Sequence, residues 1–290
     1  MLKKKIVGDK SMRIAISAET TADLTKELIE EYEIKILPFT IQLGDKSAYD
    51  GEITTDEIIE FVNQNKILPK TSAINEYQYT EHFEKLLTEY DGVVHFSLSS
   101  GLSLACTNAQ NAAKKFNNVF VVDTLSLSTG IALLALYAKE LADQGKTAEE
   151  IYNLCKERVP HVQASFELKR LDYLYKGGRC SSLTYFGANI LKIRPQIIVK
   201  DGKMISGKKY RGNFAHVVKN YCQDVIDEFN TPDLTRAFVT YTTADESIIE
   251  TAKTYLKDRG FKQILVTRAG GTITSHCGED CLGILYINDK

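Results

Sequence analysis

The chain has 290 residues, with 36 lysines and arginines against 38 aspartates and glutamates and a formal net charge of −2. This length favours two domains and allows a sizeable hydrophobic core without metal or disulfide staples. The balanced charge and the absence of tryptophan argue against a general nucleic-acid binder. The longest smooth apolar run, Ile131–Ala138, is far too short to cross a bilayer.

The six cysteines are scattered without the spacing of a disulfide framework. We therefore expect reduced thiols in a cytoplasmic protein. Lys3, Lys4 and Lys5 resemble the start of a signal peptide, but no apolar segment follows them. Residues 1–11 are interpreted as an extension or a cloning remnant, because the first strand pattern begins at Arg13.

The N-terminal part of the chain alternates between strand and helix patterns. Thr20 or Thr21 is expected to cap the first helix, and Thr54–Glu57 and Thr147–Glu150 have capping-box spacing. This alternation predicts an α/β fold with a mostly parallel sheet covered by helices on both faces. Strand patterns cover 13–17, 34–43, 93–98 and 119–123, and helix patterns occur near 24–32, 54–62, 103–115, 133–141 and after 147.

Beyond Pro160, glycines divide the chain into shorter pieces. A strand at 237–242, a helix at 245–256 and a strand at 264–268 then predict a second, smaller α/β unit. We therefore expect an N-terminal α/β domain over residues 1–165 and a C-terminal α/β domain over residues 166–290.

A serine-rich turn, Ser97-Leu98-Ser99-Ser100-Gly101-Leu102-Ser103, lies between a predicted strand and a predicted helix. Free backbone N–H groups and the positive end of the helix dipole meet at such a turn, which suits an anion. The hydroxyls of Ser99, Ser100 and Ser103 would add donors without adding charge. A helix cap explains the serines about equally well.

Two further segments carry polar groups at predicted turns. Lys70-Thr71-Ser72 places two hydroxyls at the expected start of a helix, where an N-cap is the simpler explanation. Tyr175-Lys176-Gly177-Gly178-Arg179 combines a glycine pair with two cations but lacks the spacing of a nucleotide P-loop. The second segment is expected to be a charged surface turn, and a docking patch or anion clamp is the alternative.

His276, Cys277 and Cys281 suggest a metal site at first sight. Structural zinc usually needs a second pair of ligands at matching spacing, and the sequence contains none. We therefore expect no metal, and His276 is of more interest as a hydrogen-bond donor whose protonation can be tuned.

The order of these motifs resembles the DegV-type family, which includes the fatty-acid-binding subunits of bacterial fatty acid kinase. The resemblance runs from Arg13 to Asn288, and it implies two α/β domains with a ligand tunnel at their interface. The matching stretches are Leu171-Asp172-Tyr173-Leu174-Tyr175-Lys176-Gly177-Gly178-Arg179, close to L-x-Y-L-x-K-G-G-R, together with Ser99-Ser100-Gly101-Leu102-Ser103 and Asp201-Gly202-Lys203.

The resemblance implies a buried long-chain fatty acid whose carboxylate is held by hydroxyls of Thr71 and Ser103. Its implied neighbours are Ser72, Ser99, Ser100, His276 and Arg211, while Lys176, Gly177, Gly178 and Arg179 form a turn near the head group or a partner. The loaded protein would present the acid to a kinase subunit, which makes an acyl phosphate. The binding subunit itself would perform no chemistry and need no cofactor. Membrane contact would be at most transient, for lipid exchange.

The chain departs from the family pattern beside each of these groups. Thr71-Ser72-Ala73-Ile74-Asn75 stands for T-S-Q-P-S, Leu102-Ser103-Leu104-Ala105-Cys106 for L-S-G-T-Y, and His276-Cys277-Gly278-Glu279-Asp280 for H-x-G-P-G. Glu19-Thr20 replaces the usual Asp-Ser. Leu104 and Ile74 are expected to narrow the head-group pocket or reshape the tunnel, and Glu279 and Asp280 to add negative charge close to it.

Two other functions fit parts of this sequence. Gly101-Leu102-Ser103-Leu104-Ala105 is one residue away from G-x-S-x-G, so Ser103, His276 and an aspartate such as Asp201 or Asp224 would suit a serine hydrolase. A module that binds another small anion is the third alternative. Fatty-acid binding is favoured because burial of a 16-carbon tail supplies on the order of 10 kcal/mol before the costs of binding.

Overall fold

The computed structural model describes residues 12–180 and 194–288, so the expected N-terminal extension lies outside the described residues. The first sheet is parallel throughout and has the order β2-β1-β6-β7. Every residue of β1 and β6 is buried, as expected for central strands of a sheet covered on both faces. The four strands are β1 (Ile14–Glu19), β2 (Lys35–Leu37), β6 (Gly92–Ser97) and β7 (Val119–Asp123).

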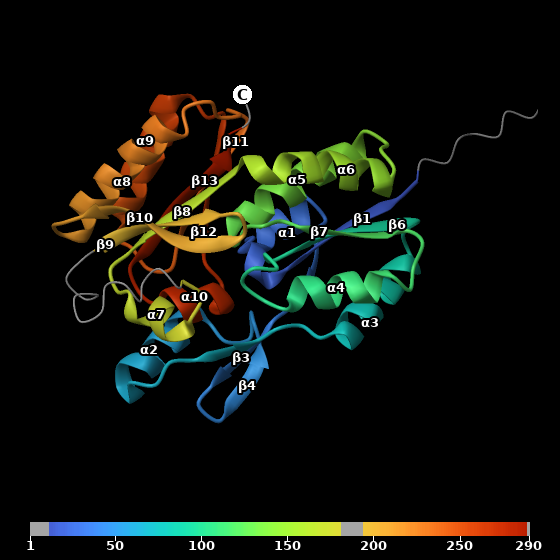
Figure 1. Ribbon diagram of the computed structural model, residues 1–290, viewed down its shortest axis with the longest axis horizontal. Helices are drawn as coiled ribbons and strands as arrows, with labels where there is room; N and C mark the ends of the chain where they lie inside the picture. The colour runs from blue at the N-terminus through green and yellow to red at the C-terminus, as the bar shows by residue number, and fades with distance from the viewer. Residues whose placement is uncertain (1–11, 181–193, 289–290) are drawn as a thin grey trace, which may run out of the picture.

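Helices cover both faces of this sheet (Figure 1). On one face, α3 (Glu76–Leu87) and α4 (Ala105–Ala113) contact β6 and each other. On the opposite face, α5 (Thr129–Asp143) and α6 (Ala148–Arg158) pack on the same strands, and the short α1 (Lys26–Glu31) connects β1 to β2. The predicted parallel sheet with helices on both faces is therefore confirmed.

The second sheet has six strands in the order β10-β9-β8-β13-β11-β12. Only β11 and β12 pair in parallel, and the other neighbours are antiparallel. Helices α8 (Phe214–Glu228) and α9 (Glu246–Arg259) pack on each other and on this sheet. The strands are β8 (Val162–Leu168), β9 (Arg194–Lys200), β10 (Lys203–Tyr210), β11 (Arg236–Tyr241), β12 (Gln263–Arg268) and β13 (Cys281–Ile287).

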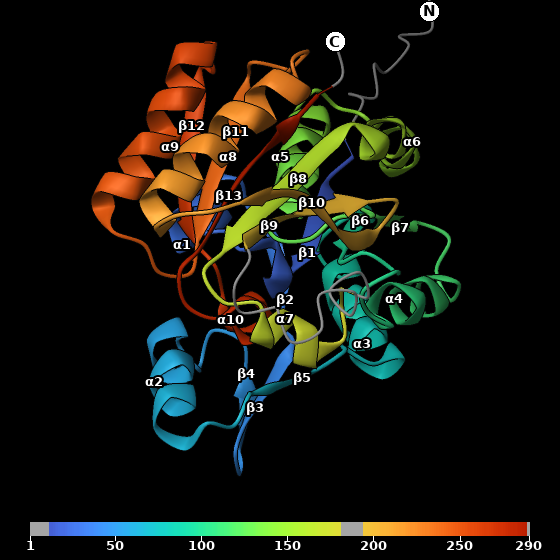
Figure 2. The same ribbon diagram turned by 60° about the vertical axis from the view of Figure 1, so that its left-hand side comes forward.

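A third, three-stranded sheet lies below the other two, and two short helices lie between it and the six-stranded sheet (Figure 2). Helix α10 contacts α7, α2, β3 and β5, so it links the C-terminal part of the chain to the small sheet. The elements are β3 (Thr40–Leu43), β4 (Lys46–Tyr49), β5 (Lys70–Ser72), α2 (Thr55–Asn65), α7 (Asp172–Gly177) and α10 (Gly271–Cys277).

Helix α5 joins the cores of the two large sheets. It contacts β1 and β6 of the first sheet and β8, β11 and β13 of the second. Ten of its residues are buried, including Ile131, Leu134 and Leu136, so it is apolar on nearly all sides. A helix of this kind must be enclosed by protein, which explains why one hydrophobic cluster extends across both sheets.

Three local predictions were wrong. The expected strand over 34–43 is broken at Pro38 into β2 and β3, which belong to different sheets. Thr20 and Thr21 form a 3-10 turn, and Thr25 caps α1 by accepting a hydrogen bond from the Leu28 N–H.

Thr71 and Ser72 do not begin a helix but belong to β5. Asn75 caps the following helix, α3, and forms a capping box with Gln78. The predicted capping boxes at Thr54–Glu57 and Thr147–Glu150 are both confirmed.

Candidate functional site

A cavity of about 190 Å³ opens beyond the carboxyl ends of the parallel strands. In this sheet β2 lies on one side of β1, and β6 and β7 lie on the other, so the strand order reverses at β1. Ligands of open α/β sheets bind at the carboxyl ends of the strands where the order reverses. Most of the cavity wall is apolar. Its lining residues are Phe39, Thr71, Ala73, Leu98, Leu102, Ser103, Leu104, Leu127, Arg179, Met204, Thr272, Ile273, His276 and Cys277.

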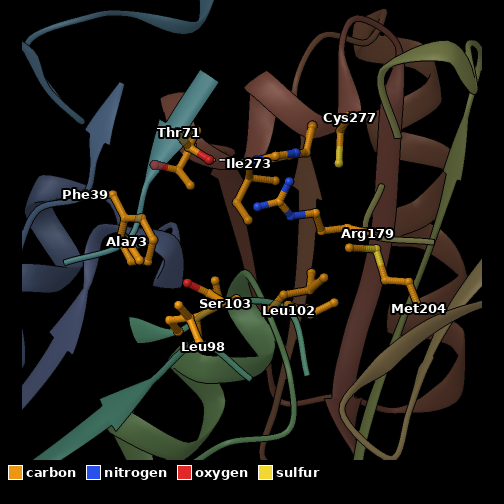
Figure 3. A pocket seen from close by; sticks show the side chains of 14 residues that line it. Phe39, Thr71, Ala73, Leu98, Leu102, Ser103, Arg179, Met204, Ile273 and Cys277 are labelled. Atoms are coloured by element: carbon orange, nitrogen blue, oxygen red, sulfur yellow. Dashed lines mark hydrogen bonds between the residues drawn. The ribbon is translucent and has the colours of Figure 1, made fainter. Parts of the chain in front are cut away.

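Four polar side chains from separate segments meet at this cavity. Thr71 comes from β5, Ser103 from the turn before α4, His276 from α10 and Arg179 from the turn after α7. Figure 3 shows Arg179 extending into the space between Thr71 and Ser103. The wall also holds Thr272, whose buried hydroxyl has no hydrogen-bond partner among the described residues. The cavity therefore combines three neutral hydroxyls with one cation, a set that suits a single carboxylate.

Ser103 is held by the backbone of the serine-rich turn. Its N–H donates to the Ser99 carbonyl at 3.2 Å, and its Oγ accepts from the Ala105 N–H at 3.2 Å. This contact does not use the hydroxyl proton of Ser103, and Ser103 lines the cavity.

His276 positions the hydroxyl of Thr71. A hydrogen bond of 2.8 Å joins Thr71 Oγ1 to His276 Nε2. Burial, with a smaller contribution from the charge of Arg179, lowers the pKa of His276 to about 4, so the ring is neutral at neutral pH. When the ring proton is on Nε2, His276 donates to Thr71 and frees the Thr71 hydroxyl proton for a ligand.

Residues 175–177, expected in a surface turn, instead form the end of α7, and Gly177 allows this helix end to pack on the His276 ring. A Cβ at position 177 would lie 2.9 Å from His276 Nδ1, closer than normal packing permits. The next residue, Gly178, ends α7 with a φ of 70°, a conformation that favours glycine. The glycine pair thus brings Arg179 to the cavity while leaving space for the histidine.

Apolar residues continue beyond the wall of this cavity. A second, smaller cavity of about 20 Å³ shares Leu127, Ile273 and Cys277 with the first. Its other walls include Phe166 and Leu285, which belong to the six-stranded sheet. The space between the sheets therefore has the polar-to-apolar order that an amphipathic ligand needs.

Glu19 organises the wall from which the serine-rich turn begins. Its buried carboxylate accepts hydrogen bonds from the Leu98 N–H at 2.7 Å, Ser97 Oγ at 2.6 Å and Tyr79 Oη at 2.5 Å. Burial acts to raise the pKa of Glu19, but neighbouring His95 and the hydroxyl donors outweigh it and hold that pKa below its usual value. The sequence marked Glu19 only as a departure from a motif and gave it no role.

Two buried aspartates hold the first turn of α10. The Gly271 and Thr272 N–H groups donate to Asp50 at 2.8 and 3.0 Å, and the Gly270 N–H donates to Asp23 at 2.7 Å. Burial raises the pKa of Asp23 to about 8. Neither aspartate was singled out from the sequence, because residues about 220 to 250 positions apart in the chain form these contacts.

The remaining predicted site residues lie away from the cavity wall. Ser99 Oγ donates to the Gly202 carbonyl at 2.7 Å, while Ser100 and Ser72 are exposed. Arg211 is also exposed and lies between β10 and α8. The structure therefore places Arg179 at the cavity and gives Arg211 no place in its wall.

The residues at which this chain differs from the family pattern lie in different surroundings. Leu104 lines the mouth of the cavity with 70% of its surface exposed, whereas Ile74 is buried in the core and does not line the cavity. Glu279 and Asp280 face cations: Asp280 pairs with Lys169, and Glu279 pairs with Arg170 at 3.5 Å. Their negative charge is thus largely compensated close by.

The hydrolase alternative finds no support in these contacts. In the described part of the chain, His276 Nε2 bonds to Thr71, and no histidine is hydrogen-bonded to Ser103. Asp224 accepts from Tyr210 Oη at 2.7 Å and pairs with Lys208. A serine nucleophile needs a base within hydrogen-bonding reach, and that contact is missing.

Residues 12–180 and 194–288 contain neither a cluster of metal-ligating side chains nor a membrane-spanning helix. No group of three or more His, Cys, Asp or Glu side chains could hold a metal ion, and no helix is long and apolar enough to cross a membrane. All six cysteines are free and buried.

The sequence matches the family model described as an uncharacterised protein of the DegV family over residues 13–289. The chain belongs to the DegV family. A relative from Thermotoga maritima, described as a fatty acid-binding protein, is 30% identical over 283 residues, 94% of this chain and 96% of the relative. A DegV domain-containing protein from Clostridium acetobutylicum is 29% identical over 280 residues, 95% of this chain and 98% of the relative.

Solved DegV structures share the fold. A DegV family protein from Thermus thermophilus, described by its fatty acid binding, has a TM-score of 0.87 at 26% identity, with 96% of this chain and 100% of that chain covered. A Thermotoga maritima protein described as revealing fatty acid binding function has a TM-score of 0.81 at 28% identity, with 95% and 99% covered. The family resemblance and the α/β fold expected from the sequence are both confirmed.

Proposed function

We propose that this DegV protein binds a long-chain fatty acid, with the carboxylate at Thr71 and Ser103 and the tail between the two large sheets. The observation that carries the proposal is the convergence of these two hydroxyls on one cavity whose apolar walls continue inward. The fatty-acid-binding descriptions of relatives at 26 to 30% identity support the same ligand class.

The two ends of such a ligand are stabilised in different ways. Each buried CH₂ contributes about 0.8 kcal/mol, so the tail supplies most of the affinity. The carboxylate would lose its charge or reject the site if it were buried without partners. Hydroxyl donors from Thr71 and Ser103, with the Arg179 guanidinium beside them, compensate for its desolvation.

The protein itself is proposed to be a carrier, which presents the acid to a kinase subunit for acyl-phosphate formation. Two features support this role. Ser103 has no histidine base among the described contacts, and Arg179 and Leu104 stand exposed at the cavity mouth, where a partner can reach the carboxylate. We propose a cytoplasmic location, where such a kinase and its ATP would be found.

A double variant with a matched control tests the ligand assignment. Thr71→Ala with Ser103→Ala should lower palmitate affinity at least tenfold by calorimetry and release lipid seen by native mass spectrometry. The control, Ser72→Ala with Ser100→Ala, removes two exposed hydroxyls from the same two segments and should bind as the wild type does. Equal binding by both double variants would refute the assignment.

The carrier role requires a second assay. Palmitate-loaded protein incubated with ATP should form acyl phosphate only when a fatty acid kinase subunit is added, trapped as the hydroxamate. Product formed by the protein alone would show that it is itself an enzyme. Product formed equally well from free palmitate would show that presentation is unnecessary.

A further inference from the structure

One hydroxyl group in the wall of the proposed fatty-acid cavity has no hydrogen-bond partner. Thr272 lines this cavity and is 3% exposed, and its Oγ1 bonds to none of the described residues. Other unpartnered buried polar atoms, such as Ser126 Oγ and Gln163 Oε1, belong to residues that do not line the cavity. A buried hydroxyl without a partner is costly and uncommon, so the Thr272 hydroxyl would gain from a polar atom of a ligand.

The other two hydroxyl side chains of α10 are used within the protein. Thr274 Oγ1 bonds to Thr55 Oγ1 at 3.1 Å, and Ser275 Oγ donates to the backbone carbonyl four residues before it at 2.7 Å. Thr272 is held through its backbone instead, since its N–H donates to the buried Asp50 carboxylate at 3.0 Å. The fold therefore fixes the position of Thr272 without using its hydroxyl.

The carboxylate of the proposed fatty acid has enough donors without Thr272. The hydroxyls of Thr71 and Ser103 and the guanidinium of Arg179 supply donors for both of its oxygens. Thr272 precedes His276 by four residues, so the two side chains lie on the same face of α10, about 6 Å apart along the helix axis. Because His276 bonds to Thr71, Thr272 lies one helical turn away from the residues assigned to the carboxylate.

We propose that Thr272 makes the cavity selective for fatty acids that carry a hydroxyl group near the carboxyl end, on carbon 2 or carbon 3. A hydroxyl on these carbons stays close to the carboxylate, within reach of the neighbouring helical turn. The Thr272 hydroxyl can donate to it or accept from it, whereas an unsubstituted acyl chain offers no partner. This selectivity rests on the proposed fatty-acid binding and narrows its ligand class.

The apolar surroundings of Thr272 make the presence or absence of this hydrogen bond important. Phe39, Leu98, Leu127 and Ile273 line the same cavity. A ligand hydroxyl that enters such a space loses its water and needs a polar partner from the protein. A site that can bond to a ligand hydroxyl also disfavours the analogue that lacks it, because its own polar group then stays unpaired.

Calorimetry on the full-length protein with palmitate, 2-hydroxypalmitate, 3-hydroxypalmitate and 16-hydroxypalmitate tests the proposal. We expect the wild type to bind the 2-hydroxy or the 3-hydroxy acid about tenfold more tightly than palmitate, with no gain from the hydroxyl on carbon 16. Thr272→Val replaces the hydroxyl by a methyl group of similar size. It should abolish the preference and leave palmitate affinity undiminished.

Two further variants separate recognition of the ligand hydroxyl from general damage to the cavity. Thr71→Val removes a proposed carboxylate partner, so it should weaken all four acids alike and leave the preference intact. Thr272→Ser keeps the hydroxyl and should keep the preference, so it tests the proposal even where the valine variant fails to fold.

Three results would overturn the proposal: equal affinities of the wild type for palmitate and for both the 2-hydroxy and 3-hydroxy acids, a preference that persists in Thr272→Val, or an equal gain from the hydroxyl on carbon 16. If none of the four acids binds the wild type, the fatty-acid function itself fails. Palmitate binding without a preference refutes only the selectivity, so the two failures are distinguishable.

Discussion

The cavity proposed to hold the fatty acid and a second depression, lined by Lys66, Lys70 and Lys176, share Thr71, Arg179 and His276 but differ in the residues around them. On the cavity side, leucines, Ile273 and Met204 surround the hydroxyls of Thr71, Ser103 and Thr272, whereas the other side adds three lysines and lacks most of the aliphatic wall. Neutral donors in an apolar setting allow a buried head group to keep its charge. Several cations in an open setting attract a more highly charged group from solvent. The neutral His276 ring belongs to both sides and separates them.

Replacement of Glu19 should lower the free energy of unfolding, because its carboxylate holds the cavity wall at the start of the serine-rich turn. In Glu19→Gln, the amide cannot accept from all the donors that now bind the buried carboxylate, so we expect a loss of about 3 kcal/mol in the free energy of unfolding. Urea denaturation measures it. Glu33→Gln, at an exposed ion pair with Lys139, should cost less than about 1 kcal/mol. Equal losses would contradict the role assigned to Glu19.

Acid should weaken the shared wall through His276. The folded-state pKa is about 4 and the ordinary value 6.5, so the unfolded chain takes up the proton first and stability falls as pH drops from about 6.5 towards 4. Between pH 7.5 and pH 5, the ligand-free wild type should lose about 2 kcal/mol more than His276→Gln. His82, whose pKa burial lowers to about 3, titrates in both proteins and cancels.

Urea denaturation of the two proteins at both pH values gives this difference. Parallel stability curves for the wild type and His276→Gln would show that the histidine does not lose its charge on folding.

A methyl group at position 177 should weaken palmitate binding through the His276 ring. Gly177→Ala would push the His276 ring away from the turn, because the added Cβ would lie 2.9 Å from Nδ1. We expect about a tenfold loss of palmitate affinity, which corresponds to about 1.4 kcal/mol, with little change in overall stability. The control is Gly145→Ala, at an exposed turn where an added Cβ meets nothing within 4 Å; its φ of 82° strains an alanine, so this variant should lose stability and keep its palmitate affinity. Calorimetry on both variants is sufficient, and unaltered palmitate affinity in Gly177→Ala would show that the ring need not touch this turn.

Local patterns predicted the parts of the fold that depend on neighbouring residues. The alternation of strands and helices predicted the parallel sheet, and the spacing of Thr54 with Glu57 predicted a capping box, because a box needs only one turn of helix. The run 34–43 was predicted as one strand because its apolar residues fit one strand as well as two, and Pro38 divides it into β2 and β3.

Only those site residues that belong to a recognisable motif could be predicted from the sequence. Thr71, Ser103 and His276 were named from the family resemblance, and the structure brings them together at one cavity. The roles of Asp23 and Asp50 could not be read from the sequence, because their partners on α10 are more than 200 residues away and only the folded chain joins them. Lys66 and Lys70 likewise have no motif, and their shared position depends on how β5 meets α7 and α10.

The most direct test of the account is a crystal structure of the protein with bound palmitate. We predict carboxylate oxygens within hydrogen-bonding distance of Thr71 Oγ1 and Ser103 Oγ, and a tail that passes Leu127, Ile273 and Cys277 towards the six-stranded sheet. A carboxylate at Arg211, a tail that runs in the opposite direction, or a ligand outside this cavity would contradict it.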